Sequence, residues 1–277
     1  FHDAGAWSTF GAAIAATFLL KRDADALARA IDSAGAIPFL SWSRTAPEGA
    51  GMHHLCIGLA ASTGVTVAYG AAAGLSAIPG ALENFFGPRA GAAFAESRVL
   101  EGVSGERWTS YELMNAYLKV HPTCAHLHGI NDATEHLIAE HAIQGVDVAS
   151  VEIASYAKGL AYDNHHPQTE LAARFSAAYT TAIALLRGNL DADAVTGAAL
   201  HDPAVRDLVA RITVRHDPEL DRYYPAGRPA RVAITLKDGR RVEASCMYPR
   251  GDSTNPTTRA ERREKARNLL STRFGAA

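Results

Sequence analysis

Alanine and glycine dominate the sequence up to about residue 114, and this feature constrains the fold most. Apolar residues recur there with helical periodicity, and Asp23 and Gly35 stand where the second helix would begin and end. Side chains as small as those of Gly58, Ala60 and Gly64 allow helices to approach each other closely. We therefore predict a tightly packed helical domain over residues 1–114, with helices at 7–20, 24–36, 54–73 and 90–95.

The pattern changes after residue 114. Amphipathic helices are predicted at 125–141 and 170–186, and alternation of apolar and polar residues predicts strands at 146–154, 211–216, 230–236 and 241–247. Asp238-Gly239 is a hairpin signal between the last two strands. This order predicts an α+β domain over residues 115–252, followed by a charged helical segment at 253–277.

Charge and cysteine content exclude several classes of protein. The 27 basic and 29 acidic side chains give a formal net charge of -2, which argues against a general nucleic-acid surface. The three cysteines are far apart, so we expect no disulfide framework and a reducing compartment. The apolar runs are shorter than a bilayer requires, and no basic segment precedes the first one. We expect a cytoplasmic protein that binds neither membrane nor nucleic acid.

Residues 117–128, YLKVHPTCAHLH, gather proton-transferring and cationic groups at the junction of the two predicted domains, where ligand sites commonly form. Pro122 would fix a turn, and a helix starting near Cys124 would place Cys124 and His128 on one face. Three interpretations compete: polar packing at an interface, a metal site, and a metal-free acid–base site for an anionic substrate. No second Cys/His cluster has zinc spacing, so the metal interpretation is the least favoured, and we predict no metal.

Further ionisable groups lie at the predicted ends of elements, where side chains can converge. Each of them alone is more often structural than catalytic. They are His2 before the first helix, His53 and His54 before the small-residue helix, Tyr162 beside Asp163, His165 and His166, and Arg174 in the next helix.

Several segments together resemble the MmgE/PrpD family, the group of 2-methylcitrate dehydratase and cis-aconitate decarboxylase. KVHPTCAHLHGINDA is similar to the family's Lys-x-x-Pro-x-(Cys/His)-x-x-x-His segment, and FHDAGAWSTFGAAIAATFLL to its Phe-His segment. CIGLAASTGVTVAYGAAAGLSAIPGALE, DNHHPQTELAARFSAAYTTAIALLRG and YPRGDSTNPTT resemble three further family segments in the same order. No single motif is highly specific, but five in the right order are.

The resemblance implies a mainly α fold, with a large all-helical domain, a smaller α+β lid domain and a C-terminal helix that returns to the helical domain. It implies a homodimer with the active site between the domains and no cofactor. Residues 1–114 would be the second half of the family's helical domain. The first half would be missing, or would be supplied by a separate chain.

The family's site residues fall on positions of this sequence that match its motifs. The resemblance places the catalytic positions on His2, Lys119, Cys124, His128 and, less directly, Tyr162. Substrate-binding roles are expected for His53, His54, His126 and Arg174. The sequence departs from the decarboxylase in two places, because His53 stands where the decarboxylase has a lysine and Cys124 where it has a histidine. Both departures weaken the expectation of cis-aconitate decarboxylation.

The reaction that the resemblance implies is lyase chemistry on a small di- or tricarboxylate, most simply dehydration or hydration of a 2-methylcitrate-like acid. His2 would be the general base, Lys119 and His128 would hold carboxylate, Tyr162 would protonate the leaving hydroxyl, and Cys124 would line the pocket. Decarboxylation or epimerisation of a related polycarboxylate, or a non-catalytic subunit of the same fold, remain the alternatives.

Overall fold

The computed structural model describes residues 3–38, 40, 42–90, 95, 101, 103–104, 107–108, 111–191 and 194–275. The chain divides into two compact units. Unit 1 contains residues 1–46 and 50–111, and unit 2 contains residues 47–49 and 112–277.

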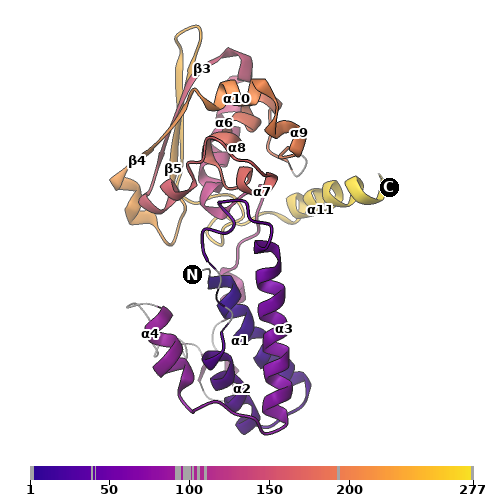
Figure 1. Ribbon diagram of the computed structural model, residues 1–277. Coiled ribbons are helices and arrows are strands. Elements are labelled where there is room, and N and C mark those ends of the chain that lie inside the picture. The colour runs from indigo at the N-terminus through magenta and orange to yellow at the C-terminus, as the bar shows by residue number, and fades with distance from the viewer. Residues whose placement is uncertain are drawn as a thin grey trace. The chain divides into compact units, whose positions relative to one another are not determined.

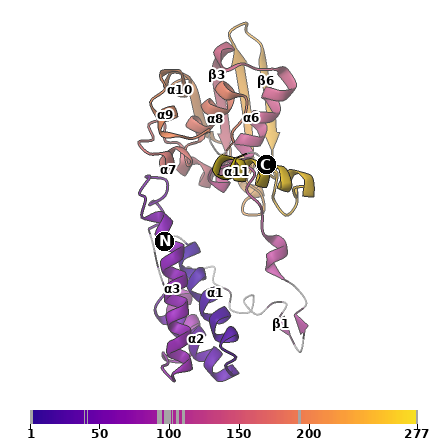
Figure 2. The same ribbon diagram turned by 90° about the vertical axis from the view of Figure 1, so that its right-hand side faces the viewer.

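Unit 1 is built on three helices that pack on one another: α1 (Asp3–Leu19), α2 (Ala24–Ala36) and α3 (His53–Ala72) (Figure 2). The contact between α1 and α3 depends on Gly64, because a Cβ atom there would lie 2.3 Å from the carbonyl oxygen of Thr9. Asp23 caps α2 by accepting a hydrogen bond from the backbone N–H of Ala26. These helices confirm the three long helices predicted from the sequence.

After α3 the chain forms a π-helix, η1 (Leu82–Phe86), and a short helix, α4 (Gly87–Ala90). Phe86 packs edge-on against Trp7 and Phe10 of α1, which ties this segment to the three-helix core. Most of the helix predicted at residues 90–95 lies outside the described residues.

Helix α3 is long and apolar enough, by length and composition, to cross a membrane, so the prediction that every apolar run is too short for that is wrong. This is weak evidence for a membrane, because the core helix of a soluble protein can have the same length and composition. One face of α3 packs on α1 through Gly64 and carries buried Ala60, Val67 and Ala71. Its apolar composition therefore has a packing role on at least one side.

The predicted fold class is wrong in two respects. Unit 1 is not all-helical, because it contains an antiparallel pair of strands, β1 (Val103–Ser104) and β2 (Arg107–Trp108). Each strand has two residues, which is too short for alternation to be visible in the sequence. The α+β part is also the larger unit of this chain, since residues 112–277 form one compact body that includes the C-terminal helix.

Unit 2 contains a four-stranded mixed sheet of order β4-β3-β5-β6 (Figure 1). Its strands are β3 (Val148–Ser155), β4 (Ile212–His216), β5 (Ala230–Leu236) and β6 (Arg241–Cys246). β3 pairs in parallel with β4 and antiparallel with β5, and β5 and β6 form the predicted hairpin. All four predicted strands are confirmed, and the bounds of β5 agree with the prediction to the residue.

Helices cover one face of the sheet (Figure 1). α6 (His128–His141) packs on β5 and β6, and α8 (Ala177–Arg187) packs on α6 and β4. Val242, Ala244 and Cys246 of β6 face this core, while the alternating Arg241 and Glu243 are exposed. α10 (Pro203–Val209) packs on α8, and the short helices α7 (Glu170–Ala173) and α9 (Gly197–Leu200) contact each other.

The helix predicted at 170–186 is broken. Ser176 has extended backbone and caps α8 by accepting from the N–H of Tyr179, so α7 ends before it. A serine hydroxyl satisfies a free N–H at a helix start better than it serves a helix interior, which is the reason for the break.

Five 3-10 segments and a terminal helix complete unit 2: η2 (Glu112–Asn115), η3 (Ala125–Leu127), η4 (Gly145–Asp147), η5 (Ala157–Tyr162), η6 (Pro218–Tyr223) and α11 (Arg259–Phe274). α11 begins with a capping box made by Thr258 and Glu261. The predicted charged C-terminal helix is therefore confirmed, whereas its packing on the helical domain stays a prediction.

Candidate functional site

The segment from Tyr117 to His128 is held against two other loops of unit 2. The N–H of Leu118 donates to the carbonyl of Gly251 at 2.9 Å. Gly251 has a φ of +92°, and a Cβ there would lie 2.0 Å from the carbonyl oxygen of Leu118. Gly129, one residue after the segment, would similarly place a Cβ 2.2 Å from the carbonyl oxygen of Arg228. Both glycines permit a backbone approach that no other residue allows.

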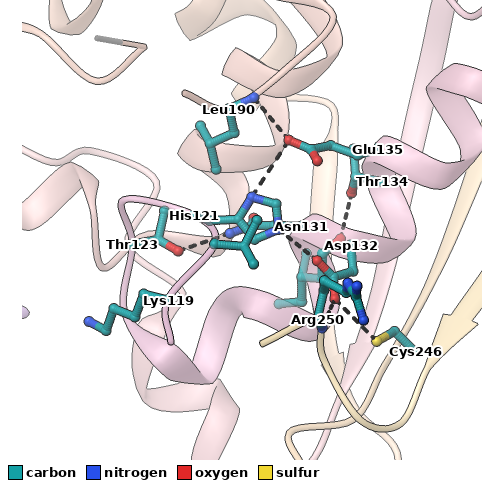
Figure 3. A network of polar contacts seen from close by, with 12 residues as sticks. Lys119, His121, Thr123, Asn131, Asp132, Thr134, Glu135, Leu190, Cys246 and Arg250 are labelled. Carbon is teal, nitrogen blue, oxygen red and sulfur yellow. Dashed lines mark hydrogen bonds and ion pairs between the residues drawn. The ribbon is translucent and has the colours of Figure 1, made fainter. Parts of the chain in front are cut away.

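A buried polar network lies under the segment (Figure 3). His121 is 2% exposed, and its Nε2 lies 2.6 Å from Oδ1 of Asp132 while its Nδ1 lies 3.6 Å from Oε1 of Glu135. Asp132 also accepts from the N–H of Arg250 at 2.6 Å, and Glu135 accepts from the N–H of Leu190 at 3.0 Å. The network thus links the segment, α6 and two distant loops, which fixes the backbone that carries the neighbouring side chains.

Lys119 points away from this network (Figure 3). A cavity of about 830 Å³ lies between the segment and α11, and Lys119, His121, Glu135 and Lys265 are among its lining residues. The ammonium of Lys265 donates to the carbonyl oxygens of Lys119 and Val120. Burial and the charge of Lys119 lower the pKa of Lys265, so two cations lie close together at this edge of unit 2.

His128 is the first residue of α6 and is 1% exposed. Burial, aided by the charges of His121 and Lys119, lowers its pKa to about 3, so the ring is neutral at pH 7. Its Nε2 atom is buried and has no hydrogen-bond partner among the described residues. A neutral imidazole can bind a substrate through a hydrogen bond, but it supplies no charge to a carboxylate.

Cys124 lies just before the first helical turn. Its φ of −59° and ψ of 140° are not helical, and the 3-10 segment η3 starts only at Ala125, so the prediction that Cys124 shares a helical face with His128 is wrong. Burial raises the pKa of the thiol, while Lys119, the N–H of His126 and the hydroxyl of Tyr162 all act to lower it. Burial also raises the pKa of Tyr162, whose hydroxyl is hydrogen-bonded to Cys124. Both groups are therefore protonated at neutral pH.

Aromatic rings form one wall beside Cys124. His126 stacks on Tyr162 with ring centroids 5.0 Å apart, and its Nδ1 is hydrogen-bonded to the hydroxyl of Tyr156. Tyr156 in turn stacks on Tyr224 at 5.1 Å. Burial raises the pKa of Tyr156, so its hydroxyl is protonated at neutral pH.

Arg228 is a further cation of this site that the sequence did not single out. Its guanidinium carbon lies 4.9 Å from the centre of the Tyr117 ring, and its Nη1 lies 3.4 Å from Oδ2 of Asp252. Its Nε is buried without a hydrogen-bond partner in the described part of the chain. Burial raises the pKa values of Tyr117, Cys124 and Tyr156, and the charge of Arg228 opposes that rise in all three, as the charge of Lys119 does at Cys124. It lies in a turn-rich stretch, PAGRPAR, where no sequence signal marks it.

The structure brings together five of the residues predicted for the site. Lys119, Cys124, His126, His128 and Tyr162 lie in one region of unit 2, joined by the contacts given above. The predicted substrate-binding residue Arg174 braces that region, because its guanidinium donates to the carbonyls of Pro122 and Val195 at 3.1 Å each. Its role toward substrate stays a prediction.

The remaining predicted residues are His53, His54 and His2. His53 and His54 lie in the first turn of α3 in unit 1, with ring centroids 6.3 Å apart. His2 lies outside the described residues. Among the residues that the structure describes, no group of three or more His, Cys, Asp and Glu side chains is arranged to hold a metal ion. The expectation of metal-free chemistry stays a prediction.

Comparison with known sequences identifies the larger unit. The sequence model of the MmgE/PrpD C-terminal domain matches residues 121–277, from the buried His121 through α11, which is more than half of the chain. A search of curated proteins finds no match. Proteins of the matching family are generally lyases. The domain match covers more than half of the chain and agrees with the five motifs in family order. The chain therefore belongs to the MmgE/PrpD family.

Proposed function

We propose that this chain is part of a cofactor-independent lyase that acts on a small di- or tricarboxylate, most simply a dehydratase or hydratase. The observation that carries the proposal is the arrangement around Cys124. Lys119 and Arg228 both act electrostatically on its thiol, while the nearby histidine His128 and the hydroxyl of Tyr162 are neutral. Two cations beside neutral proton donors suit an acid with two or three carboxylates.

The proposed reaction starts with removal of the proton alpha to a carboxylate. Negative charge then develops on the substrate, and Lys119 and Arg228 stabilise it by Coulomb attraction in a partly buried site. The C–O bond on the neighbouring carbon breaks, and Tyr162 supplies the proton that converts the leaving hydroxyl to water. Its raised pKa keeps that proton available at neutral pH. We assign the general base to His2, as the family resemblance implies, and the neutral His128 to a hydrogen bond with the substrate.

The same first step serves epimerisation, and the same cations serve decarboxylation. Cys124 stands where the decarboxylase has a histidine, and burial keeps its thiol protonated, so it adds no cationic acid to the site. This supports dehydration or hydration ahead of decarboxylation, and the proton-exchange test below separates both from epimerisation. A non-catalytic subunit of the same fold would show none of the three.

The proposal also includes a partner. Apolar side chains of α1 and α3 are exposed in unit 1, which supports a homodimer or a further helical chain that covers them. We place the working enzyme in the cytoplasm, in keeping with its widely spaced cysteines.

The test is to incubate the purified protein in heavy water with a panel of di- and tricarboxylates and to follow the substrate by NMR. Loss of water with alpha-proton exchange indicates a dehydratase, exchange alone an epimerase, and release of CO₂ a decarboxylase. Lys119→Ala and Arg228→Ala are each expected to lower kcat/KM by about 10²-fold or more. Tyr162→Phe should retain alpha-proton exchange and lose elimination of water.

The matched control is Lys237→Ala, which removes an exposed lysine from the far end of β5 and should leave kcat/KM unchanged. Near-normal turnover in both Lys119→Ala and Arg228→Ala would place the site elsewhere. No exchange with any acid of the panel would favour the non-catalytic subunit.

A further inference from the structure

Unit 2 contains a second, polar cavity that shares no residue with the site around Cys124. Its volume is about 320 Å³, at the small end of the range of ligand pockets. It lies among the loop after η5, the start of α8 and the ends of α9 and α10, which are neighbours on the helical side of the sheet (Figure 1). Its lining includes six side chains that can donate hydrogen bonds: His165, His166, Gln168, Tyr179, His201 and Arg206.

Tyr179 is one of the lining residues, and its hydroxyl is an unused hydrogen-bond donor. The residue is 2% exposed, and its hydroxyl has no hydrogen-bond partner among the described residues. Burial raises its pKa to about 12, so the hydroxyl keeps its proton at neutral pH. A buried hydroxyl without a partner is unfavourable, and an acceptor in the cavity would relieve it.

Arg206 and His201 add positive and donor character. Nη2 of Arg206 lies 3.3 Å from Nδ1 of His201, and its Nε donates to the carbonyl of Leu200, which orients the guanidinium. Because a guanidinium can only donate, Nδ1 of His201 is the acceptor, and in the neutral ring Nε2 carries the proton. Burial raises the pKa of Tyr179 and the charge of Arg206 opposes that rise, so the two groups share one environment.

Acidic residues near the cavity are engaged elsewhere. Glu170 and Asp202 raise the pKa of Tyr179, but Glu170 accepts from the N–H of Gly197 and Asp202 caps α10 by accepting from the N–H of Ala204. Asp163 accepts from Nε2 of His165 at 2.8 Å, so it orients that ring. The remaining groups that line the cavity are mainly donors.

We propose that this cavity binds a small oxyanion, a phosphate or carboxylate group, which accepts hydrogen bonds from Tyr179, His201 and Arg206. Oxyanions suit such a set because each oxygen accepts several hydrogen bonds, and an arginine with neutral donors recognises them without a metal. The inference is independent of the proposed reaction, since it rests on a different cavity. The segment that lines it follows Tyr162 directly, so an occupant would contact the loop next to the candidate active site.

The test is isothermal titration of the purified protein with inorganic phosphate and, separately, with propane-1,2,3-tricarboxylate, at constant ionic strength in chloride. Saturable binding of one of the two is expected. Tyr179→Phe removes one oxygen atom and should weaken that binding about tenfold, since a hydrogen bond to a charged group is lost. Arg206→Gln should weaken it by at least as much. Tyr69→Phe and Arg215→Gln, at exposed positions, are the matched controls and should bind as the wild type does.

Lys119→Ala separates the two sites, because it should lower kcat/KM in the proposed reaction and leave the binding that depends on Tyr179 and Arg206 unchanged. Binding that Tyr179→Phe and Arg206→Gln leave intact would overturn the inference, and so would no saturable binding of either anion. Tyr179→Phe keeps the ring that packs in the core, and a melting temperature no lower than that of the wild type verifies its fold.

Discussion

At the residue scale, burial sets the charge of the groups around Cys124. His128, Cys124 and Tyr162 each lose water when the chain folds, and in each the pKa moves toward the neutral form. Positive charge is left to Lys119 and Arg228. The site therefore separates two tasks, since cations attract the substrate while neutral side chains exchange hydrogen bonds or protons with it.

His128 makes the stability of the protein depend on pH. Its pKa is near 6.5 in an unfolded chain and about 3 in the folded protein, so folding favours the neutral ring. The contribution is fully present above pH 6.5 and is lost as the pH falls toward 3. We expect the titration of His128 to lower the free energy of unfolding by about 2 kcal/mol when the pH falls from 7 to 5.

The measurement is urea unfolding at pH 7 and at pH 5 for the wild type and His128→Phe, which keeps a ring but cannot be protonated. The variant should lose less stability over this interval. His136→Phe, at a position where the side chain is 64% exposed, is the control and should follow the wild type. Equal losses in wild type and His128→Phe would show that this ring is already charged or not buried.

At the element scale, close backbone contacts hold the Lys119 segment in place. Gly251 and Gly239 both have left-handed backbone, with φ of +92° and +88°. A Cβ atom on Gly251 would lie 2.0 Å from the carbonyl oxygen of Leu118, whereas a Cβ atom on Gly239 would meet nothing within 4 Å among the described residues. The comparison of the two glycines therefore separates the cost of the backbone conformation from the cost of the contact.

Gly239→Ala is expected to destabilise the protein by about 1 kcal/mol, the cost of a left-handed alanine. Gly251→Ala should cost roughly 3 kcal/mol, because the clash adds to the same conformational strain. Urea unfolding at neutral pH measures both. The second variant should also lower turnover, since Lys119 follows Leu118 directly. Equal destabilisation by the two substitutions would contradict the contact.

At the scale of the whole molecule, unit 1 exposes apolar side chains on two helices. On α3, Leu55, Leu59, Val65 and Tyr69 fall on the face opposite Gly64, and each is more than 40% exposed. On α1 the exposed residues are Trp7, Ile14 and Phe18. Exposed apolar residues aligned along one helix face mark an interface, so we expect the chain to associate through the α3 face.

Light scattering after size exclusion should give a mass above the 29.4 kDa of one chain. Leu59→Glu should lower that mass toward 29.4 kDa, because it places a charge in the middle of the α3 face. Leu113→Glu, at an 81% exposed position in η2, is the control and should not change it. A wild-type protein that is monomeric at micromolar concentration would rule out self-association, and a helical partner chain would then be the remaining candidate.

The sequence by itself determined the elements and the family. Local periodicity and turn residues predict the three long helices of unit 1 and the four strands of the sheet, because those signals depend on neighbours within a few residues. Short-range motifs in family order also located Lys119, Cys124, His128 and Tyr162. Two errors have local causes: strands of two residues carry no visible alternation, and Ser176 prefers a cap to a helix interior.

Only the tertiary structure decided how these groups act. Arg228 contacts the ring of Tyr117, although the two residues are more than a hundred positions apart in the sequence. His121 lies beside the carboxylates of Asp132 and Glu135 only because α6 packs against its segment. The low pKa of His128 and the unpartnered hydroxyl of Tyr179 likewise follow from burial against distant segments. Desolvation and Coulomb interactions depend on distance in space, so no local pattern in the sequence carries them.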